Sequence, residues 1–198
     1  MKNEIIKRIL SSAIILPTTL FFVAKGSIYF IFFLAIFFLI TSYEWLRMTK
    51  NKLLSFLGVF FLFITTYTAY LLRGNEIYDL FIFLFVIIIC ISTDIGGYVF
   101  GKIFKGPKLI KISPNKTYSG MIGSFLLSLF LANFYQNELY KLNLIADLFF
   151  KNEILLLIFI LLISLISQLG DLLISYFKRL SKIKNTGIIL PGHGGLLD

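Results

Sequence analysis

The sequence has 198 residues, of which 58% are hydrophobic and only 15% are charged, and its mean hydropathy is +0.91. Soluble domains carry charge on about 25% of their residues, so this composition excludes a water-soluble domain and indicates a membrane protein. The net charge is +9. Because the basic residues are scattered between apolar runs, we expect no nucleic-acid partner, and anionic headgroups and phosphates fit better.

Six apolar runs approach the roughly 17 to 25 residues that a transmembrane helix requires. Their residues do not follow the amphipathic period of a surface helix, so lipid is expected on most sides of each helix. The sequence therefore predicts an all-α fold, a polytopic transmembrane helical bundle that forms one integral membrane domain over residues 1–198. The predicted spans cover residues 9–24, 27–45, 53–72, 77–93, 120–135 and 154–176.

The basic residues indicate how these spans are oriented. With the N-terminus inside, fifteen of the 19 basic residues fall in cytoplasmic segments, as the positive-inside rule requires. The outer side keeps Lys25, Arg73, Lys141 and Lys151. We therefore expect a multi-pass protein of the inner (plasma) membrane, with cytoplasmic site loops at residues 94–119 and 177–198.

The first polar inner segment runs from Asp94 to Thr117. It combines a carboxylate, four glycines and clustered lysines, a pattern that favours close backbone approach and phosphate binding. It ends in Ser113-Pro114-Asn115-Lys116-Thr117 directly before a span. The alternative is an ordinary cytoplasmic loop in which Gly97 and Gly101 form a small-residue helix contact.

The second polar segment lies on the last predicted helix. Gln168, Asp171, Ser175 and Lys178 are three, four and three residues apart, so they share one helical face, with Arg179 at its edge. Charged side chains within spans are costly and usually face a pocket or one another. The alternative to a binding face is an internal ion pair of Asp171 with one of the two basic residues.

The sequence after this helix is rich in glycine and contains the single histidine. Pro191, Gly192, His193, Gly194 and Gly195 form a turn whose backbone N–H groups can bind an anion. A flexible tail would also explain the glycines, but it would not explain a proline so close to the only imidazole.

Taken together, these motifs resemble the phosphatidate cytidylyltransferase, or CDP-diacylglycerol synthase, family. The resemblance covers most of the chain, in order and spacing. The matching residues are Asp94, Gly97, Tyr98, Gly101, Ser113–Thr117, Gln168–Leu172, Ser175, Lys178, Arg179, Lys184, Pro191–Gly195 and Asp198. Two positions depart from the family pattern, Ser119 and Asn185. The chain also stops at Asp198, before the usual Arg-x-Asp continuation and last helix, so we expect a shortened form.

The resemblance implies transfer of CMP from CTP to phosphatidic acid, giving CDP-diacylglycerol and pyrophosphate. It implies that Asp171 and Asp198 bind Mg²⁺, with a second cation left open, and that Lys178 and Arg179 act on the phosphates as catalytic residues. The implied substrate-binding residues are Ser113, Asn115, Lys116, Thr117, Ser175, Lys184, His193, Gly194 and Gly195. Membrane lipids and a second copy of the chain, in a homodimer, are further expected partners.

Three other functions remain open from the sequence. A CTP-dependent lipid kinase acting on a polyprenol or phytol-type alcohol would also combine membrane spans with basic inner loops. A transporter or channel would instead place polar residues near the bilayer midplane, with broken helices in both halves. A purely structural membrane subunit would leave the glycine-rich turn at residues 191–195 unexplained.

Overall fold

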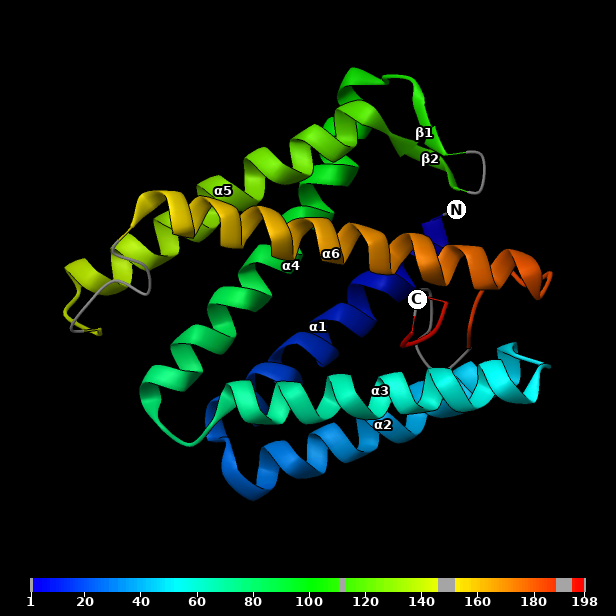
Figure 1. The fold of residues 1–198 in the computed structure, drawn as a ribbon, viewed down its shortest axis with the longest axis horizontal. Coiled ribbons are helices and arrows are strands. Elements are labelled where there is room, and N and C mark those ends of the chain that lie inside the picture. Colours follow the sequence, from blue (N-terminus) through cyan, green and yellow to red (C-terminus); the bar gives the residue numbers. More distant parts are fainter. Residues whose placement is uncertain (1, 111–112, 146–151, 188–193, 198) are drawn as a thin grey trace. The chain divides into compact units, whose positions relative to one another are not determined.

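The computed structural model describes residues 2–110, 113–145, 152–187 and 194–197, without the side chains of residues 2–10, 12, 114 and 115. Six helices and one short hairpin make up this part of the chain (Figure 1). In chain order the elements are α1 (Lys2–Lys25), α2 (Ser27–Met48), α3 (Lys52–Arg73), α4 (Ile77–Phe104), β1 (Lys108–Ile110), β2 (Ser113–Thr117), α5 (Tyr118–Lys141) and α6 (Glu153–Leu180). The predicted all-α bundle is confirmed.

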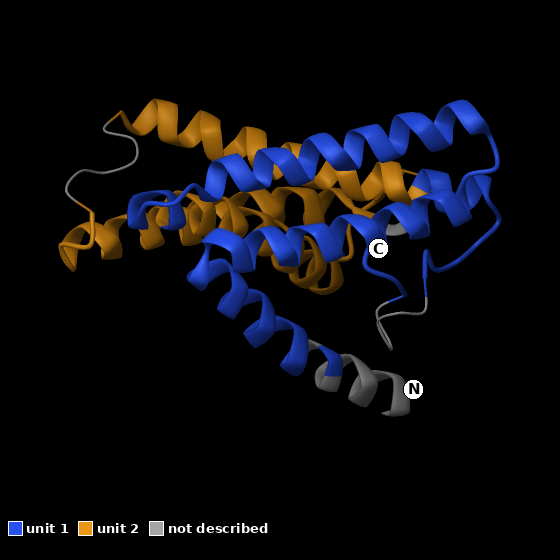
Figure 2. Ribbon diagram, turned by 90° about the horizontal axis from the view of Figure 1, so that it is seen from below, with its two compact units in different colours: residues 1–80, 176–198 blue, residues 81–175 orange. Residues whose placement is uncertain are grey.

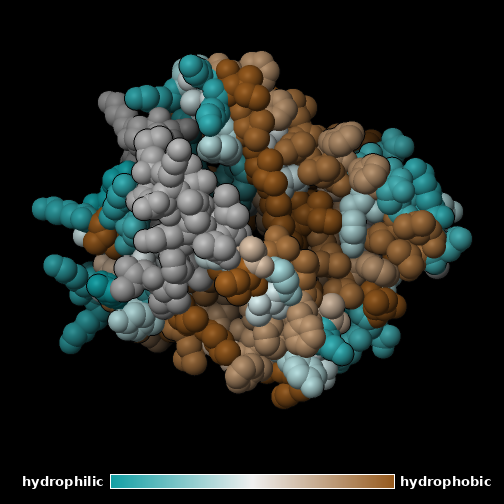
Figure 3. Space-filling model, turned by 180° about the vertical axis from the view of Figure 1, so that it is seen from behind, coloured by the Kyte–Doolittle hydropathy of each residue, from teal (hydrophilic) through white to brown (hydrophobic). Residues whose placement is uncertain are grey.

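Five of these helices, α2 to α6, are long and apolar enough to cross a membrane. In α1 the apolar stretch within the described residues is shorter, from Ala13 to Lys25. Many large apolar side chains are exposed, among them Ile14 and Phe56. Figure 3 shows such side chains over much of the visible surface. Lipid is the solvent that this surface requires.

The chain divides into two compact units (Figure 2). The first contains residues 1–80 and 176–198, and the second contains residues 81–175. Helix α6 contributes to both, because it runs without interruption through Ser175 and Tyr176.

In the first unit, α2 and α3 are joined by a short turn that Asn51 caps. The Asn51 side chain accepts hydrogen bonds from the backbone N–H groups of Leu53 and Leu54, which would otherwise have no partner. Trp45 connects the two helices, because its Nε1 donates to the carbonyl of Leu54 on α3 at 3.1 Å. Its ring also packs edge-on against that of Phe177 on α6, with centroids 4.9 Å apart. The end of α2 is therefore fixed to both α3 and the end of α6.

A buried arginine holds the other end of α2 and α3. The Nε atom of Arg73 donates to the carbonyl of Val23 at 2.7 Å, and its Nη2 atom donates to that of Ala24 at 3.3 Å. These carbonyls lie at the end of α1, where they lack helical partners and where positive charge is favourable. Gly26, at φ 62°, turns the chain from α1 into α2 beside this guanidinium.

The core of the second unit lies between α4, α5 and the first turns of α6. Phe85 and Ile89 from α4, Ala132 from α5, and Leu156 and Ile160 from α6 form one buried cluster. Asn152 caps α6 by accepting from the N–H groups two and three residues further on. This core fixes the three helices that carry the site described next.

One sequence expectation about this unit is wrong. The segment that begins at Asp94 was expected to be a loop, but α4 continues as a helix to Phe104. Its glycines do not break the helix because they allow α5 to approach closely: a Cβ atom on Gly96 would lie 2.5 Å from the carbonyl oxygen of Gly123. Small residues at such crossings are typical of helix packing in membranes. The structure thus agrees with the alternative, a small-residue contact, for this part of the segment.

Candidate functional site

The segment Ser113–Thr117 forms the second strand of an antiparallel hairpin and places Thr117 next to α4 and Lys116 next to α6. Strand β1 pairs with it in a register that joins Lys108 to Thr117 and Ile110 to Ser113. Thr117 is also the N-cap of α5, because its Oγ1 accepts from the N–H of Gly120 at 3.1 Å. The hairpin therefore ends rigidly on α5, which fixes the position of Lys116.

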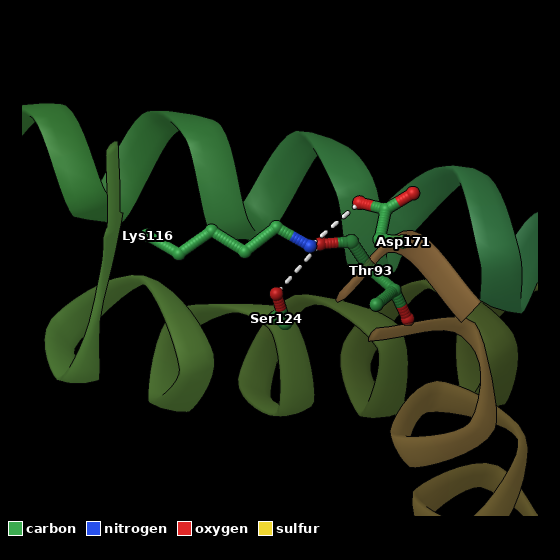
Figure 4. A network of polar contacts seen from close by, with 4 residues as sticks. All are labelled: Thr93, Lys116, Ser124 and Asp171. Atoms are coloured by element: carbon green, nitrogen blue, oxygen red, sulfur yellow. Dashed lines mark hydrogen bonds and ion pairs between the residues drawn. The ribbon is translucent and has the colours of Figure 1, made fainter. Parts of the chain in front are cut away.

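Lys116 forms an ion pair with Asp171 of α6. Its Nζ atom lies 2.9 Å from Oδ2 of Asp171, and Figure 4 shows the lysine side chain extending from β2 to that carboxylate. The alternative reading from the sequence was an internal ion pair of Asp171 with Lys178 or Arg179, and the ion pair in the structure has a different partner. Its partner is a lysine from the hairpin, 55 residues away in the sequence.

Buried hydroxyl groups connect the helices near this ion pair. The Oγ atom of Ser124 on α5 donates to the carbonyl oxygen of Thr93 at 2.7 Å (Figure 4). Thr93 Oγ1 in turn lies 2.8 Å from Ser164 Oγ on α6. These contacts link α4, α5 and α6 through polar groups that would be costly to bury without partners. These polar contacts therefore help to hold α4, α5 and α6 together.

A cavity of about 270 Å³ opens around the ion pair. Its volume lies near the lower end of the range for small-molecule sites, about 300 to 1,000 Å³. The residues that line it are Thr93, Asp94, Gly97, Tyr98, Leu109, Ser113, Lys116, Thr117, Gly120, Met121, Ser124, Gln168, Asp171 and Leu172. The hairpin and all three helices of the second unit thus contribute to one cavity.

Asp94 is the second carboxylate of this cavity. It lines the wall with Asp171, and the charges of both Asp171 and Lys116 act on it. Within the described residues no group of three or more histidine, cysteine, aspartate or glutamate side chains could hold a metal ion. Two carboxylates are nevertheless enough for Mg²⁺, which keeps several waters and takes further oxygens from substrate phosphates. The donor set therefore suits a magnesium ion that binds together with a phosphorylated substrate.

Gln168 has an unsatisfied hydrogen-bond donor beside the cavity. It lines the wall one helical turn from Asp171, and its Nε2 atom is buried without a hydrogen-bond partner among the described residues. Buried donors are normally paired, so this unpaired amide is an exception beside the cavity. The cavity itself can supply one ammonium and several hydroxyl groups to phosphate oxygens.

Comparison with known proteins identifies the family of the chain. A sequence model described as the cytidylyltransferase family matches residues 51–198. The chain belongs to this family. A protein of Rickettsia bellii named phosphatidate cytidylyltransferase is 36% identical over 210 residues, covering 100% of this chain and 85% of the relative. A protein of the same name from Rickettsia conorii is 36% identical over 209 residues, with the same coverage. One from Staphylococcus epidermidis is 42% identical over 116 residues, covering 58% of this chain and 42% of the relative.

Within this cytidylyltransferase, the structure brings four of the predicted site residues to the cavity: Ser113, Lys116, Thr117 and Asp171. The predicted stripe also lies on one continuous helix, because α6 extends from Glu153 to Leu180. Ser175 is four residues beyond Asp171 on that helix, while Lys178 and Arg179 occupy its last turn in the first unit. Their roles toward the substrates stay predictions.

The remaining predicted residues lie elsewhere or outside the described part of the chain. Lys184 is exposed, and Gly194 and Gly195 lie in the first unit beside Glu44. His193 and Asp198 fall outside the described residues, as does the side chain of Asn115. The predicted sharing of a metal ion by Asp171 and Asp198 therefore stays a prediction.

Asp94 belongs to one of the motifs that resemble the family, but it was not among the site residues predicted from the sequence. A carboxylate among apolar residues near the end of a span was the available signal, since such residues usually face a pocket. Thr93 and Ser124 carried no comparable signal, because single hydroxyl groups are common in membrane helices.

Proposed function

We propose that this protein is a phosphatidate cytidylyltransferase, which transfers CMP from CTP to phosphatidic acid and releases pyrophosphate. The observation that carries the proposal is the cavity in which Lys116 and Asp171 pair beside Asp94, at one end of apolar helices. Phosphatidate cytidylyltransferase is also the name of the relatives that match the whole chain. A lipid substrate is consistent with a site built on membrane-spanning helices.

The reaction requires charge neutralisation and alignment more than a general base. A phosphate oxygen of phosphatidic acid, already ionised near neutral pH, attacks the α-phosphorus of CTP. A new P–O bond forms, and the bond between the α- and β-phosphates breaks with pyrophosphate as the leaving group. Because the nucleophile and the leaving group are both anionic, positioned cations and hydrogen-bond donors lower the barrier.

Lys116 supplies one of these cations. As an ammonium on a flexible stem, it can exchange its contact with Asp171 for a phosphate oxygen of CTP without leaving the cavity. Ser113 and Thr117 flank it on the same strand and offer hydroxyl groups to the triphosphate. By resemblance to the family, Lys178 and Arg179 neutralise further phosphate charge, Arg179 by bidentate contact.

Asp94 and Asp171 are the residues of the described chain that would hold Mg²⁺, with Asp198 as the further ligand that the sequence predicts. When bound there, Mg²⁺ would supply electrostatic stabilisation to the phosphate oxygens on which negative charge develops. Both carboxylates belong to long helices, so their positions are defined before any substrate binds.

We place the site at the cytoplasmic face of the inner membrane, where CTP is available. The distribution of basic residues supports this orientation, and Lys116 and the hairpin belong to the most lysine-rich of the inner segments. Membrane lipids would surround the exposed apolar faces of the helices. A homodimer stays a prediction from the sequence.

The proposal is tested by assaying the detergent-solubilised full chain with phosphatidic acid, CTP and Mg²⁺. We expect label on the α-phosphate of CTP to enter the lipid product, together with stoichiometric release of pyrophosphate. Transfer of label from the γ-phosphate to a lipid alcohol, with CDP as the second product, would establish the lipid kinase instead. Solute or ion flux into liposomes without nucleotide consumption would establish a transporter.

A further inference from the structure

Glu44 is a buried carboxylate in the last turn of α2, and its side chain binds the C-terminal segment of the chain. Only 1% of its surface is exposed. The backbone N–H of Leu196 donates to both carboxylate oxygens, at 3.0 and 2.9 Å, and that of Leu197 donates to Oε2 at 2.9 Å. Thr186 Oγ1 donates to the same Oε2 at 3.0 Å. All four residues belong to the first unit.

Two glycines make room for this carboxylate. A Cβ atom on Gly187 would lie 2.1 Å from Oε1 of Glu44, and one on Gly195 would lie 2.1 Å from Oγ1 of Thr186. The two short segments that contain these glycines also contact each other. The N–H of Gly187 donates to the carbonyl of Gly194 at 2.8 Å. Gly195 has a φ of 139°, where other residues are strained. Gly187 and Gly195 therefore both leave the space that the Glu44 carboxylate and its partner Thr186 occupy.

Glu44 accepts more hydrogen bonds than would be needed merely to attach this segment to α2. A buried carboxylate is stable only when several donors compensate for its lost hydration, and here two successive backbone N–H groups and one hydroxyl do so. Charge-assisted hydrogen bonds of this kind fix a backbone more firmly than neutral ones. The segment held in this way contains Gly194 and Gly195, which the sequence predicts to face substrate phosphates.

We propose that Glu44 is a positioning residue for cytidylyl transfer. By binding Thr186, Leu196 and Leu197, its carboxylate fixes the backbone of Gly194 and Gly195 in the conformation in which they meet substrate phosphate. The proposal rests on the proposed function.

The test compares steady-state kinetics of the full chain in detergent for wild type, Glu44→Gln and the exposed control Glu153→Gln. We expect kcat/KM for CTP, per folded molecule, to fall about tenfold or more in Glu44→Gln, because an NH₂ group replaces one acceptor of the N–H groups. Glu153→Gln should match wild type. If Glu44→Gln loses folded protein but each folded molecule keeps the wild-type kcat and KM, the residue is merely structural and the proposal is overturned.

A second pair of variants leaves Glu44 in place. Thr186→Val removes one donor to the carboxylate at nearly constant volume, whereas Thr186→Ser keeps it. We expect Thr186→Val to lower kcat/KM severalfold and Thr186→Ser to stay within about twofold of wild type, since one charge-assisted hydrogen bond separates them. Equal activity of the two variants would contradict the proposal. If wild type itself forms no CDP-lipid, the proposed function fails first.

Hydrogen exchange provides a readout that does not depend on activity. In the wild-type protein the amides of Leu196 and Leu197 should exchange slowly, because Glu44 accepts both. Their exchange should become faster in Glu44→Gln and stay unchanged in Glu153→Gln. If the amides of Leu196 and Leu197 in wild type exchange as fast as those of an open turn, the proposal is overturned, even if the Glu44 variants fail to fold.

Discussion

The Nζ atom of Lys116 lies 2.9 Å from Oδ2 of Asp171, so the hairpin between α4 and α5 is joined to α6 by opposite charges. The lysine was predicted to bind nucleotide and the aspartate to bind a metal ion. Because the two side chains are in contact, the residue predicted to bind nucleotide and the residue predicted to bind metal lie side by side in the cavity. Each partner can therefore be tested for a role in the reaction beyond the ion pair itself.

Replacement of Asp171 by asparagine should remove activity while the protein remains inserted in the membrane. The amide keeps the shape of the side chain but loses the charge that a divalent cation requires, and we expect kcat to fall about a hundredfold or more. Initial rates of CDP-lipid formation measure the effect. Glu138→Gln, which breaks the exposed ion pair with Lys141 on α5, is the matched control. Full activity of Asp171→Asn would exclude a metal role for Asp171.

Replacement of Lys116 by methionine should separate stability from catalysis. The ion pair is partly exposed, so its loss should cost no more than about 1 kcal/mol of unfolding free energy. The loss of a cation that contacts phosphate should instead raise KM for CTP about tenfold or more. Thermal unfolding and CTP titration give the two quantities. If both change as little as in the control Lys141→Met, Lys116 does not contact the nucleotide.

Asparagine in place of Asp94 should weaken the response to Mg²⁺. If Asp94 and Asp171 hold the ion together, the Mg²⁺ concentration for half-maximal activity should rise about tenfold or more. Asp79→Asn, at the other end of the same helix, should leave it unchanged, since an amide oxygen can still accept from the N–H of Glu76. A wild-type Mg²⁺ titration for Asp94→Asn would assign the metal to other residues.

Alanine at Gly96 should destabilise the second unit. Its Cβ atom would lie 2.5 Å from the backbone oxygen of Gly123, so α4 and α5 would have to move apart, at a cost of about 1 to 3 kcal/mol. At Gly170 no atom of the described residues, apart from the neighbouring backbone of α6 itself, lies within 4 Å of such a Cβ atom, and alanine there should be neutral or mildly stabilising. Thermal unfolding in detergent compares the two variants. Equal melting temperatures would show that the helices do not meet as closely as described.

The orientation can be measured with single cysteines in a Cys90→Ser background. Lys50→Cys and Asn75→Cys lie at opposite ends of α3, and both positions are exposed. In sealed inside-out vesicles a membrane-impermeant maleimide should label the first and not the second, and in right-side-out vesicles the reverse should hold. The opposite pattern would place the candidate site on the outer face.

The sequence was sufficient for the helices and for the polar stripe of α6, because apolar runs and helical spacing are local properties. It was not sufficient for the extension of α4 to Phe104, since glycine is compatible both with a loop and with close helix contact. The pairing of Lys116 with Asp171 depends on how a hairpin and a distant helix meet, which no spacing in the sequence records.

Glu44 is a different case, because a signal was present. A carboxylate near the end of an apolar span needs partners, so Glu44 could have been recognised from the sequence as a residue that requires them. The partners could not have been identified from spacing, since Leu196 is 152 residues further along the chain. Only the folded structure joins the two segments.

That separation has a consequence for biosynthesis. The ribosome delivers α2 to the membrane long before it has made the residues that hydrogen-bond to Glu44. Until Thr186, Leu196 and Leu197 have been made, this carboxylate must stay hydrated near the bilayer surface, and their arrival lets it become buried. A chain interrupted before Leu196 would keep an unsatisfied acid at this position, which quality-control proteases could recognise.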